Sequence, residues 1–386
     1  MTASKFLRAV LPVLLLAGCG GSAPSPSSAP GGGSSDGILI GHYGSMTGSE
    51  ATFGQSTDNG IRLAIEEFNA AGGLSGRRIE LKTYDTQGKS QEAGTAVTRL
   101  ITDDKVVAVL GEVASSLSIA GGRVAQQFGV PMITPSSTNP AVTQIGDKVF
   151  RVCFLDSFQG RAAAQFARDH LKVSRAAILY DQGQAYSKGL KDFFKEAFVA
   201  RGGTITTEQA YGGGDQDFSA QLTTIRATAP EVIYVPGYYT DAGNIALQVR
   251  KLGLKAPLLG GDGWDSTQLV AIGGEAIEGS YFTNHYSHQD QRPEVDNFVQ
   301  RYRAKFGQVP DGLAALGYDA ARLLFDAMAR GKSLSGADLA AAIAATRDFP
   351  GVTGRITIDP NRDAQKSAVV VQVRGGVPVY VATVEP

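Results

Sequence analysis

Small polar side chains follow short apolar runs of the sequence, at the points where strands are expected to end. Ser115 comes soon after the apolar run 106–110, and Ser136 and Thr138 follow the run 131–134. Hydroxyl groups and the free N–H groups at the start of a helix are suited to binding a carboxylate. Serine and threonine are also common as helix N-caps and in turns, which is the structural alternative for these residues.

An acidic residue and several aromatic residues occupy comparable positions later in the chain. Asp262 lies between two glycines, and Tyr186 and Tyr238 each follow a predicted strand. A carboxylate can hold an ammonium group through charge-assisted hydrogen bonds, which are about twice as strong as neutral ones. Phe53 and Trp264 are further aromatic candidates. With the hydroxyl groups, these residue types suit a small zwitterion that has an apolar remainder. The alternatives are a turn role for the acid and a place in the core for the aromatics.

Motifs that are typical of enzymes fail on their context or spacing. The segment 33–37 fits G-x-S-x-G but lies in a Gly/Ser-rich stretch, not at a strand-to-helix turn. Two segments that end like a P-loop, 88–90 and 331–333, lack the glycine required five residues earlier. His285 and His288 are close in sequence, but no cysteine or third histidine joins them, so a surface pair is a simpler interpretation than a metal site. We therefore expect no catalytic residue, no metal and no cofactor.

The spacing of apolar residues after residue 37 predicts alternating strands and helices. The predicted strands are 38–43, 78–84, 106–110, 131–134, 176–180, 204–208, 232–235 and 258–259. Helical stretches follow them, such as 58–71, where apolar residues recur with the helical period. Such alternation predicts parallel sheets covered by helices on both faces, with a ligand beyond the carboxyl ends of the strands. The chain is too long for one such sheet with one core, so we expect an α/β fold with two doubly wound lobes.

The last third of the chain departs from this alternation. Three consecutive helices and then two strands are expected, at 295–306, 313–329, 337–345, 368–373 and 377–381. Gly375 and Gly376 would form the turn between the two strands. This order indicates that the chain crosses between the lobes more than once.

The N-terminal segment has the pattern of a targeting signal. Lys5 and Arg8 precede the apolar run 9–18, which is shorter than the ~20 residues of a membrane-spanning helix. The small residues before Cys19 resemble the lipobox of bacterial lipoproteins, in which this cysteine carries lipid; an ordinary signal peptide is the alternative. We expect residues 1–18 to be a signal peptide, followed at 19–37 by the lipidated cysteine and a flexible tether rich in Gly, Ser and Pro. The mature protein would then lie in the periplasm or at the cell surface, anchored to a membrane.

Charge and cysteine content exclude further classes of protein. The 386 residues include 36 Lys and Arg and 37 Asp and Glu, and this near balance argues against a nucleic-acid-binding protein. With Cys19 lipidated, Cys153 has no partner for a disulfide, so we expect it to be a small buried residue. No later apolar run is long enough to span a bilayer.

Beyond these patterns, a set of short segments matches a known family over about residues 37–384. The segments are Met46-Thr47-Gly48 with Phe53-Gly54, 68–76, 132–138, Phe150-Arg151 with Gln159-Gly160, 186–189, Asp217-Phe218, 317–320 and 349–354. No single segment is diagnostic, but their order and spacing are specific. The chain resembles the type 1 periplasmic binding proteins of the leucine/isoleucine/valine-binding group, which are the receptors of branched-chain amino acid ABC importers.

The resemblance implies two lobes with the ligand in the cleft between them. Three crossovers would join the lobes, near residues 151–158, 283–287 and 358–362. Lobe 1 would then comprise 38–153 and 286–359, and lobe 2 would comprise 154–285 and 360–386.

The resemblance also implies roles for individual residues. Ser115 and Thr138 would bind the α-carboxylate of an amino acid. The carbonyl oxygen of Ser136 and the carboxylate of Asp262 would hold its ammonium group. The aromatic residues expected to line the side-chain pocket are Phe53, Tyr186 and Tyr238. The bulky Trp264 departs from the family pattern and would fill part of that pocket.

The expected function is capture of a branched-chain or other apolar or neutral amino acid and its delivery to the membrane permease of an ABC importer. The protein is expected to be a monomer. Two alternatives remain open: a sensory receptor on the same fold, and a binder of an amide, urea or a small organic acid.

Overall fold

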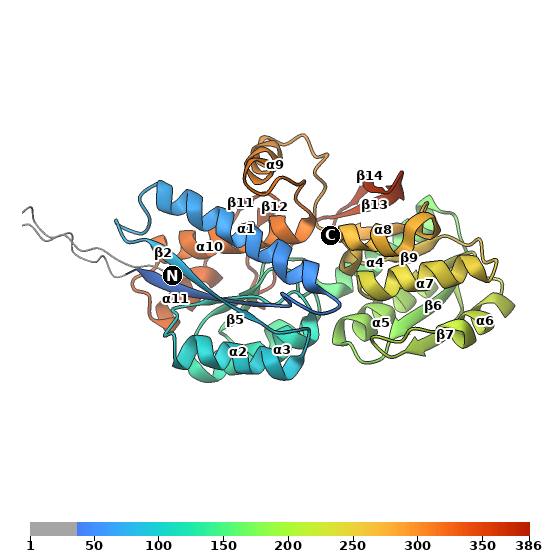
Figure 1. Cartoon of the computed structure of the whole chain (residues 1–386), viewed down its shortest axis with the longest axis horizontal. Coiled ribbons are helices and arrows are strands. Elements are labelled where there is room, and N and C mark those ends of the chain that lie inside the picture. Colours follow the sequence, from blue (N-terminus) through green and yellow to red (C-terminus); the bar gives the residue numbers. More distant parts are fainter. Residues whose placement is uncertain (1–36) are drawn as a thin grey trace, which may run out of the picture. The chain divides into compact units, whose positions relative to one another are not determined.

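The computed structural model describes residues 37–386, which contain two larger β-sheets, each with its own helices (Figure 1). The predicted signal peptide, Cys19 and residues 20–36 lie outside the described residues. Among the described helices, none is long and apolar enough to cross a membrane.

The first sheet is parallel throughout and has the strand order β2-β1-β3-β4-β5. Its strands are β1 (Ile38–Gly44), β2 (Ile79–Asp85), β3 (Val109–Leu110), β4 (Met132–Thr134) and β5 (Val149–Arg151). Six helices accompany it: α1 (Ala51–Ala70), α2 (Ser90–Thr102), α3 (Ser115–Phe128), α9 (Pro293–Phe306), α10 (Gly312–Arg330) and α11 (Gly336–Ala344).

Alternating side chains of the first sheet pack into two apolar layers, as the period of a strand requires. Val109 and Met132 pack with α2 and α3, whereas their neighbours Leu110 and Ile133 pack with α1 and α10. Helices therefore cover both faces of the sheet, with α2 and α3 on one side and α1 and α10 on the other (Figure 1). This confirms the predicted doubly wound arrangement.

The second sheet has the strand order β14-β13-β10-β9-β8-β6-β7. Its strands are β6 (Arg175–Asp181), β7 (Thr204–Tyr211), β8 (Val232–Val235), β9 (Leu258–Gly260), β10 (Tyr281–Asn284), β13 (Ala368–Arg374) and β14 (Val377–Val384). Its helices are α4 (Asp156–Gln165), α5 (Ala185–Ala200), α6 (Ser219–Ala227), α7 (Tyr239–Lys251) and α8 (Thr267–Gly273). The parallel strands β6 to β10 are extended by the antiparallel β13 and β14.

The predicted hairpin near the C-terminus is confirmed. Arg374 pairs with Val377, and the two residues between them, Gly375 and Gly376, have φ angles of 58° and 75°. A two-residue turn between antiparallel strands favours positive φ at both positions, which glycine adopts without steric cost.

The other differences from the predicted elements concern their ends and the shortest strands. The helix predicted at 58–71 begins at Ala51, and the strand predicted at 106–110 is paired only at Val109–Leu110. The strands β5, β10, β11 (Phe349–Gly351) and β12 (Gly354–Ile356) were not predicted. Each has only three or four residues, too few to show a period.

The described chain passes between the two larger sheets three times. It leaves the first sheet after β5, returns to the helices of that sheet after β10, and crosses again between β12 and β13. These connections include the crossovers expected near 151–158, 283–287 and 358–362. The exact lobe limits, 38–153 with 286–359 and 154–285 with 360–386, stay a prediction.

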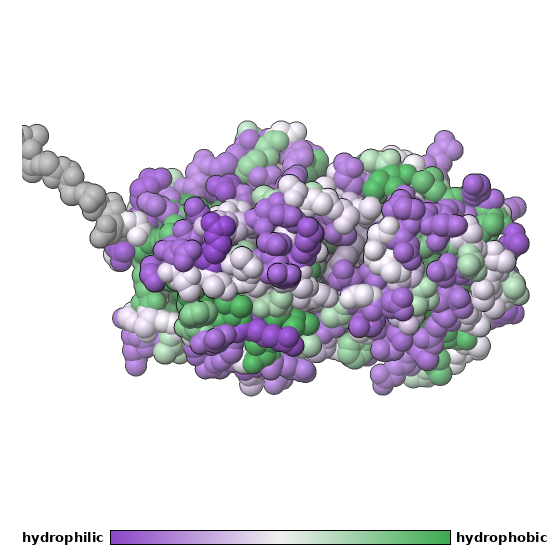
Figure 2. Space-filling view, turned by 60° about the horizontal axis from the view of Figure 1, so that its bottom comes forward, coloured by the Kyte–Doolittle hydropathy of each residue, from purple (hydrophilic) through white to green (hydrophobic). Residues whose placement is uncertain are grey.

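Apolar side chains on the surface are scattered. The large hydrophobic side chains most exposed to solvent are Phe128, Val199, Leu247, Val309, Val377 and Tyr380, which lie on separate elements or connections or at the C-terminal hairpin. Figure 2 shows one face on which hydrophilic residues predominate and hydrophobic ones form small separate patches. Cys153 is buried and free, as predicted, and its thiol donates to the carbonyl oxygen of Ser137 at 3.3 Å.

Two glycines let helices α1 and α10 touch along their backbones. A Cβ atom added at Gly60 would lie 2.0 Å from the carbonyl oxygen of Ala314, and one added at Gly317 would lie 2.6 Å from that of Thr57. Neither contact is with the end of a flexible side chain, so the helices themselves would have to separate. One face of the first sheet is thus covered by an early helix and a late helix that pack against each other at very close range.

We expect Gly60→Ala to lower the free energy of unfolding by ~1–3 kcal/mol, because overpacking outweighs the gain in helix propensity. Gly94→Ala in α2 is the matched control, since a Cβ there meets nothing within 4 Å. It should raise the stability by ~0.4–1 kcal/mol. Chemical denaturation of both variants measures the difference, and equal effects of the two substitutions would contradict the close packing of α1 and α10.

Candidate functional site

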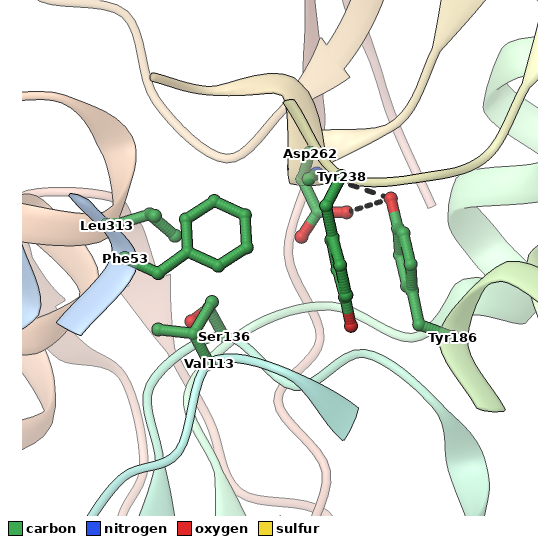
Figure 3. A pocket seen from close by; sticks show the side chains of 8 residues that line it. Phe53, Val113, Ser136, Tyr186, Tyr238, Asp262 and Leu313 are labelled. Carbon is green, nitrogen blue, oxygen red and sulfur yellow. Dashed lines mark hydrogen bonds between the residues drawn. The ribbon is translucent and has the colours of Figure 1, made fainter. Parts of the chain in front are cut away.

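A small pocket lies between side chains that come from the elements of the two larger sheets (Figure 3). Phe53, Val113, Ser136 and Leu313 come from the first sheet's elements and connections, whereas Tyr186, Tyr238, Asp262 and Gly263 come from those of the second. The structure therefore brings five of the residues singled out in the sequence around one pocket: Phe53, Ser136, Tyr186, Tyr238 and Asp262. Val113 and Leu313 were not predicted.

Parallel strands explain why these residues meet. Ser136 follows β4, Tyr238 follows β8 and Asp262 follows β9, so all three lie at carboxyl ends of parallel strands. Phe53 and Tyr186 lie in the first turns of α1 and α5, the helices that follow β1 and β6. The pocket is therefore built from strand-to-helix connections of both sheets.

Ser115 and Thr138 lie beside the pocket rather than among the residues that line it. Ser115 is the first residue of α3, and its hydroxyl accepts a hydrogen bond from the backbone N–H of Asn139 at 3.3 Å. The N-cap of α3 is Ala114, so the alternative that Ser115 is the N-cap is wrong. Thr138 is buried, and its carbonyl oxygen accepts from the backbone N–H of Asp156 at 2.9 Å.

The carboxylate of Asp262 is held by three side chains. Gln159 Nε2 and Tyr186 OH donate to Oδ1 at 2.7 and 2.9 Å, and His285 Nε2 lies 2.9 Å from Oδ2. Asp262 is 5% exposed, so these contacts fix it in a region of low dielectric constant. Asp262 is therefore an anchored anion at the edge of the pocket, which the simple alternative of a turn residue does not explain.

His285 is not part of a surface pair, and that expectation was wrong. Its side chain is buried and stacks on Phe154 with ring centroids 3.7 Å apart. Burial lowers the pKa of His285, and the neighbouring Asp262 only partly offsets this effect. A neutral imidazole can meet a carboxylate only as an N–H donor, so Nε2 carries the proton. The sequence could not indicate this role, because β10, which delivers His285, was too short to predict.

Asp156 is a second acid at the site, and sequence reasoning missed it. It begins α4, and neither oxygen of its carboxyl group has a hydrogen-bond partner of normal geometry among residues 37–386. Burial raises the pKa of Asp156 well above its usual value; the nearby Thr138 hydroxyl and the Arg151 guanidinium oppose this, whereas Asp262 adds to it. The position after a crossover was the only sequence signal available.

Other buried polar atoms around these acids are also without partners in the described chain. They are Ser136 Oγ, Gln159 Oε1, Tyr234 OH, Tyr238 OH and His285 Nδ1. Folded proteins satisfy nearly all buried polar groups, so such a cluster needs an explanation. A polar ligand that supplies both donors and acceptors would provide the missing partners.

Aromatic rings form one wall of the pocket. Tyr186 and Tyr238 stack with centroids 5.4 Å apart and planes 6° apart, and Phe53 meets Tyr238 edge to face at 5.4 Å. Trp264 does not fill the pocket, contrary to expectation. Its ring is buried against Gly260, where an added Cβ would lie 2.2 Å from it, and its Nε1 donates to the carbonyl oxygen of Val235 at 3.1 Å.

Direct hydrogen bonds around the pocket join the elements and connections of the first sheet to those of the second; we call these the two sets of elements. Thr52 Oγ1 lies 2.9 Å from Ser266 Oγ, and Thr240 Oγ1 donates to the carbonyl oxygen of Ser49 at 2.6 Å. On another side, the backbone N–H of Ala185 donates to Ser116 Oγ at 3.0 Å. These contacts close the pocket on two sides, so the structure represents a closed arrangement of the two sets.

The stability of the ligand-free protein should respond differently when each of the two acids is replaced by asparagine. Asp262→Asn should lower the stability of the ligand-free protein by ~1–3 kcal/mol, because the new amide donor would face groups that now donate to the carboxylate. Asp156→Asn should leave stability unchanged or raise it at pH 7, because an unpaired buried acid is removed. Thermal denaturation of protein freed of ligand by refolding compares them. A large loss of stability in Asp156→Asn would show that this carboxyl group has a partner.

The family model described as periplasmic binding protein matches residues 37–377 of the chain. The Leu/Ile/Val-binding protein BraC3 of Rhizobium johnstonii is 32% identical over 329 residues, which cover 84% of this chain and 88% of that protein. Two solved structures are also similar. The leucine-binding protein LivK from Thermotoga maritima has a TM-score of 0.87 and 42% identity, with 90% of this chain and 99% of that chain covered. The branched-chain amino acid transporter substrate-binding protein LivJ from Streptococcus pneumoniae, in complex with isoleucine, has a TM-score of 0.86 and 33% identity, with 91% and 100% covered.

Proposed function

We propose that this chain, which belongs to the periplasmic binding protein family, is the solute-binding receptor of an ABC importer and captures an amino acid with an apolar side chain. The observation that supports it best is the cluster of unpartnered buried polar atoms between two acids and an aromatic wall. The names of the similar proteins, which describe leucine, isoleucine and valine binding, support the same substrate class.

The ammonium group of the ligand would be held between Asp156 and Asp262. Asp262 already accepts from three side chains, whereas both oxygens of Asp156 lack partners in the described residues. A cation between two buried acids relieves their mutual repulsion and supplies the missing donors. The carbonyl oxygen of Ser136 is a further acceptor for the same group.

The carboxylate of the ligand would be bound by Ser115 and Thr138. Both hydroxyls are buried beside the pocket, and Ser115 opens α3, whose N-terminus favours a negative charge. The side chain of the ligand would contact Phe53, Val113 and Leu313. Of the residues that line the pocket, Asp262 is the charged one and is occupied with its own partners, so an uncharged side chain is favoured.

Capture would work by closure of the two lobes about the three crossovers. Ligand contacts come from both sides of the pocket, so bound amino acid stabilises the closed form and excludes water from its charged groups. The ligand would be released unchanged to a membrane permease, and no catalytic step is involved. Lipid on Cys19 would anchor this monomeric receptor outside the cytoplasmic membrane.

Calorimetry on the mature protein tests the proposed function. Leucine, isoleucine or valine should bind with a 1:1 stoichiometry and be recovered unchanged. Isopentylamine and 4-methylpentanoate, which each carry one of the two charged groups of leucine, should bind at least a hundredfold more weakly, because the other set of buried polar groups stays unpaired. Tight binding of 4-methylpentanoate, benzoate or urea without binding of leucine would instead support the organic-acid or amide alternative.

A further acid lies at the contact between the two sets of elements. Asp265 Oδ2 accepts a hydrogen bond from the backbone N–H of Gly312, at the start of α10, at 2.6 Å. Burial, together with the neighbouring Asp311, raises the pKa of Asp265 to about 7. Opening of the lobes would expose Asp265 and return its pKa towards the usual value of about 4. The closed form therefore binds a proton more readily than the open form.

We accordingly expect the affinity for leucine to fall as the pH rises from 5 to 8. Protonation of Asp265 favours the closed form; this stabilisation is complete below about pH 4 and is lost as the pH rises through about 7. With a pKa of about 7 in the closed form and about 4 in the open form, Asp265 would change the dissociation constant by up to roughly a hundredfold between these pH values, and Asp265→Asn should remove this contribution. Comparing the two proteins cancels the contributions of the other acids at the site. Parallel pH profiles would contradict a role for Asp265 in closure.

A further inference from the structure

Arg151 is a fully buried arginine at the end of β5, where the first crossover begins. Its side chain is 0% exposed, and Nε pairs with Asp363 Oδ1 at 2.6 Å. The terminal nitrogens donate to the carbonyl oxygens of Ser137 and Asn139, the latter at 2.8 Å, and to Thr143 Oγ1 at 3.0 Å. The guanidinium thus makes four hydrogen bonds inside the protein and is not directed at a ligand.

The two carbonyl groups that Arg151 holds belong to the residues on either side of Thr138. The segment 136–139 carries Ser136, which lines the pocket, and Thr138, which lies beside it. A planar guanidinium presents N–H donors in a fixed fork, so the two carbonyl groups are held at a set spacing and direction. That geometry determines where the backbone and side chain of Thr138 point.

The other partner of Arg151 belongs to the third crossover. Asp363 lies between β12 and β13, and it also accepts from Thr143 Oγ1 at 2.8 Å. The backbone N–H of Arg151 donates to the carbonyl oxygen of Arg362 at 3.2 Å, and the Arg362 side chain donates to the carbonyl oxygen of Thr143 at 2.9 Å. One buried side chain therefore joins two crossovers to segment 136–139.

We propose that Arg151 is a positioning residue that fixes segment 136–139 to the first and third crossovers, so that the ligand-binding groups of this segment keep their geometry as the lobes move. The assignment rests on the proposed function, since it takes the pocket as the ligand site. A lysine could keep the charge opposite Asp363 but not the simultaneous bonds to Ser137 and Asn139, because it offers a point charge instead of a fork. Arginine is therefore required at this position for its shape.

Arg250 provides a matched control. It also holds three carbonyl groups, donating to Ala276 at 3.2 Å and to Leu254 and Ala256 at 2.9 Å each. These residues precede β9 or β10, at the amino ends of the strands and so away from the pocket. Arg250→Lys should therefore disturb a comparable clamp without disturbing the ligand site.

The test is calorimetric titration of leucine into the mature wild-type protein and the variants Arg151→Lys, Asp363→Asn and Arg250→Lys, well below each midpoint of thermal unfolding. Arg151→Lys should weaken binding at least tenfold in protein that remains folded by circular dichroism. Asp363→Asn, which preserves the packing, should weaken binding at least threefold. The double variant Arg151→Lys/Asp363→Asn should raise the dissociation constant by less than the product of the two single fold-changes. Arg250→Lys should lower the midpoint of unfolding but leave the dissociation constant within twofold.

Wild-type affinity in both Arg151→Lys and Asp363→Asn would overturn the assignment, as would an equal loss in Arg250→Lys. If Arg151→Lys does not fold, Asp363→Asn alone decides between the outcomes. Failure of the proposed function has a different signature, since wild-type protein would then not bind leucine at all.

Discussion

The burial of Asp156 and Asp262 within electrostatic reach of each other is the constraint on which the site depends. Two acids in a region of low dielectric constant repel each other, and burial raises the pKa of Asp156 well above its usual value. The protein meets this cost differently at the two positions. Asp262 receives donors from Gln159, Tyr186 and His285, whereas Asp156 is left without partners of normal geometry in the described chain. An arrangement that is poor for stability is suited to a cationic group arriving from outside.

The elements that meet this constraint come from distant parts of the sequence. Asp156 opens the helix after the first crossover, Asp262 follows β9, and His285 lies at the second crossover. The ring of His285 stacks on Phe154, which belongs to the first crossover. The connections between the sheets therefore contribute directly to the packing around the acids of the site.

The fold could largely be predicted from the sequence, because most helices and the longer strands show a period and because glycines mark the ends of several elements. The candidate site could be predicted where a residue lies at the end of a predicted strand, as Ser136, Tyr238 and Asp262 do. Asp156 and His285 could not be found in this way, since their importance depends on burial by elements far away in the sequence. Trp264 was predicted to fill part of the pocket, but its ring packs against Gly260 instead. The sequence alone does not show on which side of a short turn a ring finds space.

The close contact of α1 with α10 has a consequence for how the chain folds. Five of the seven strands of the second sheet, β6 to β10, come from the stretch that separates these two helices, so most of that sheet is inserted between them in the sequence. Contacts between residues so far apart require closure of a very long loop, which slows folding. The early part of the chain can cover one face of its sheet with α2 and α3, but it cannot complete the core on the other face until the late helix α10 has been synthesised.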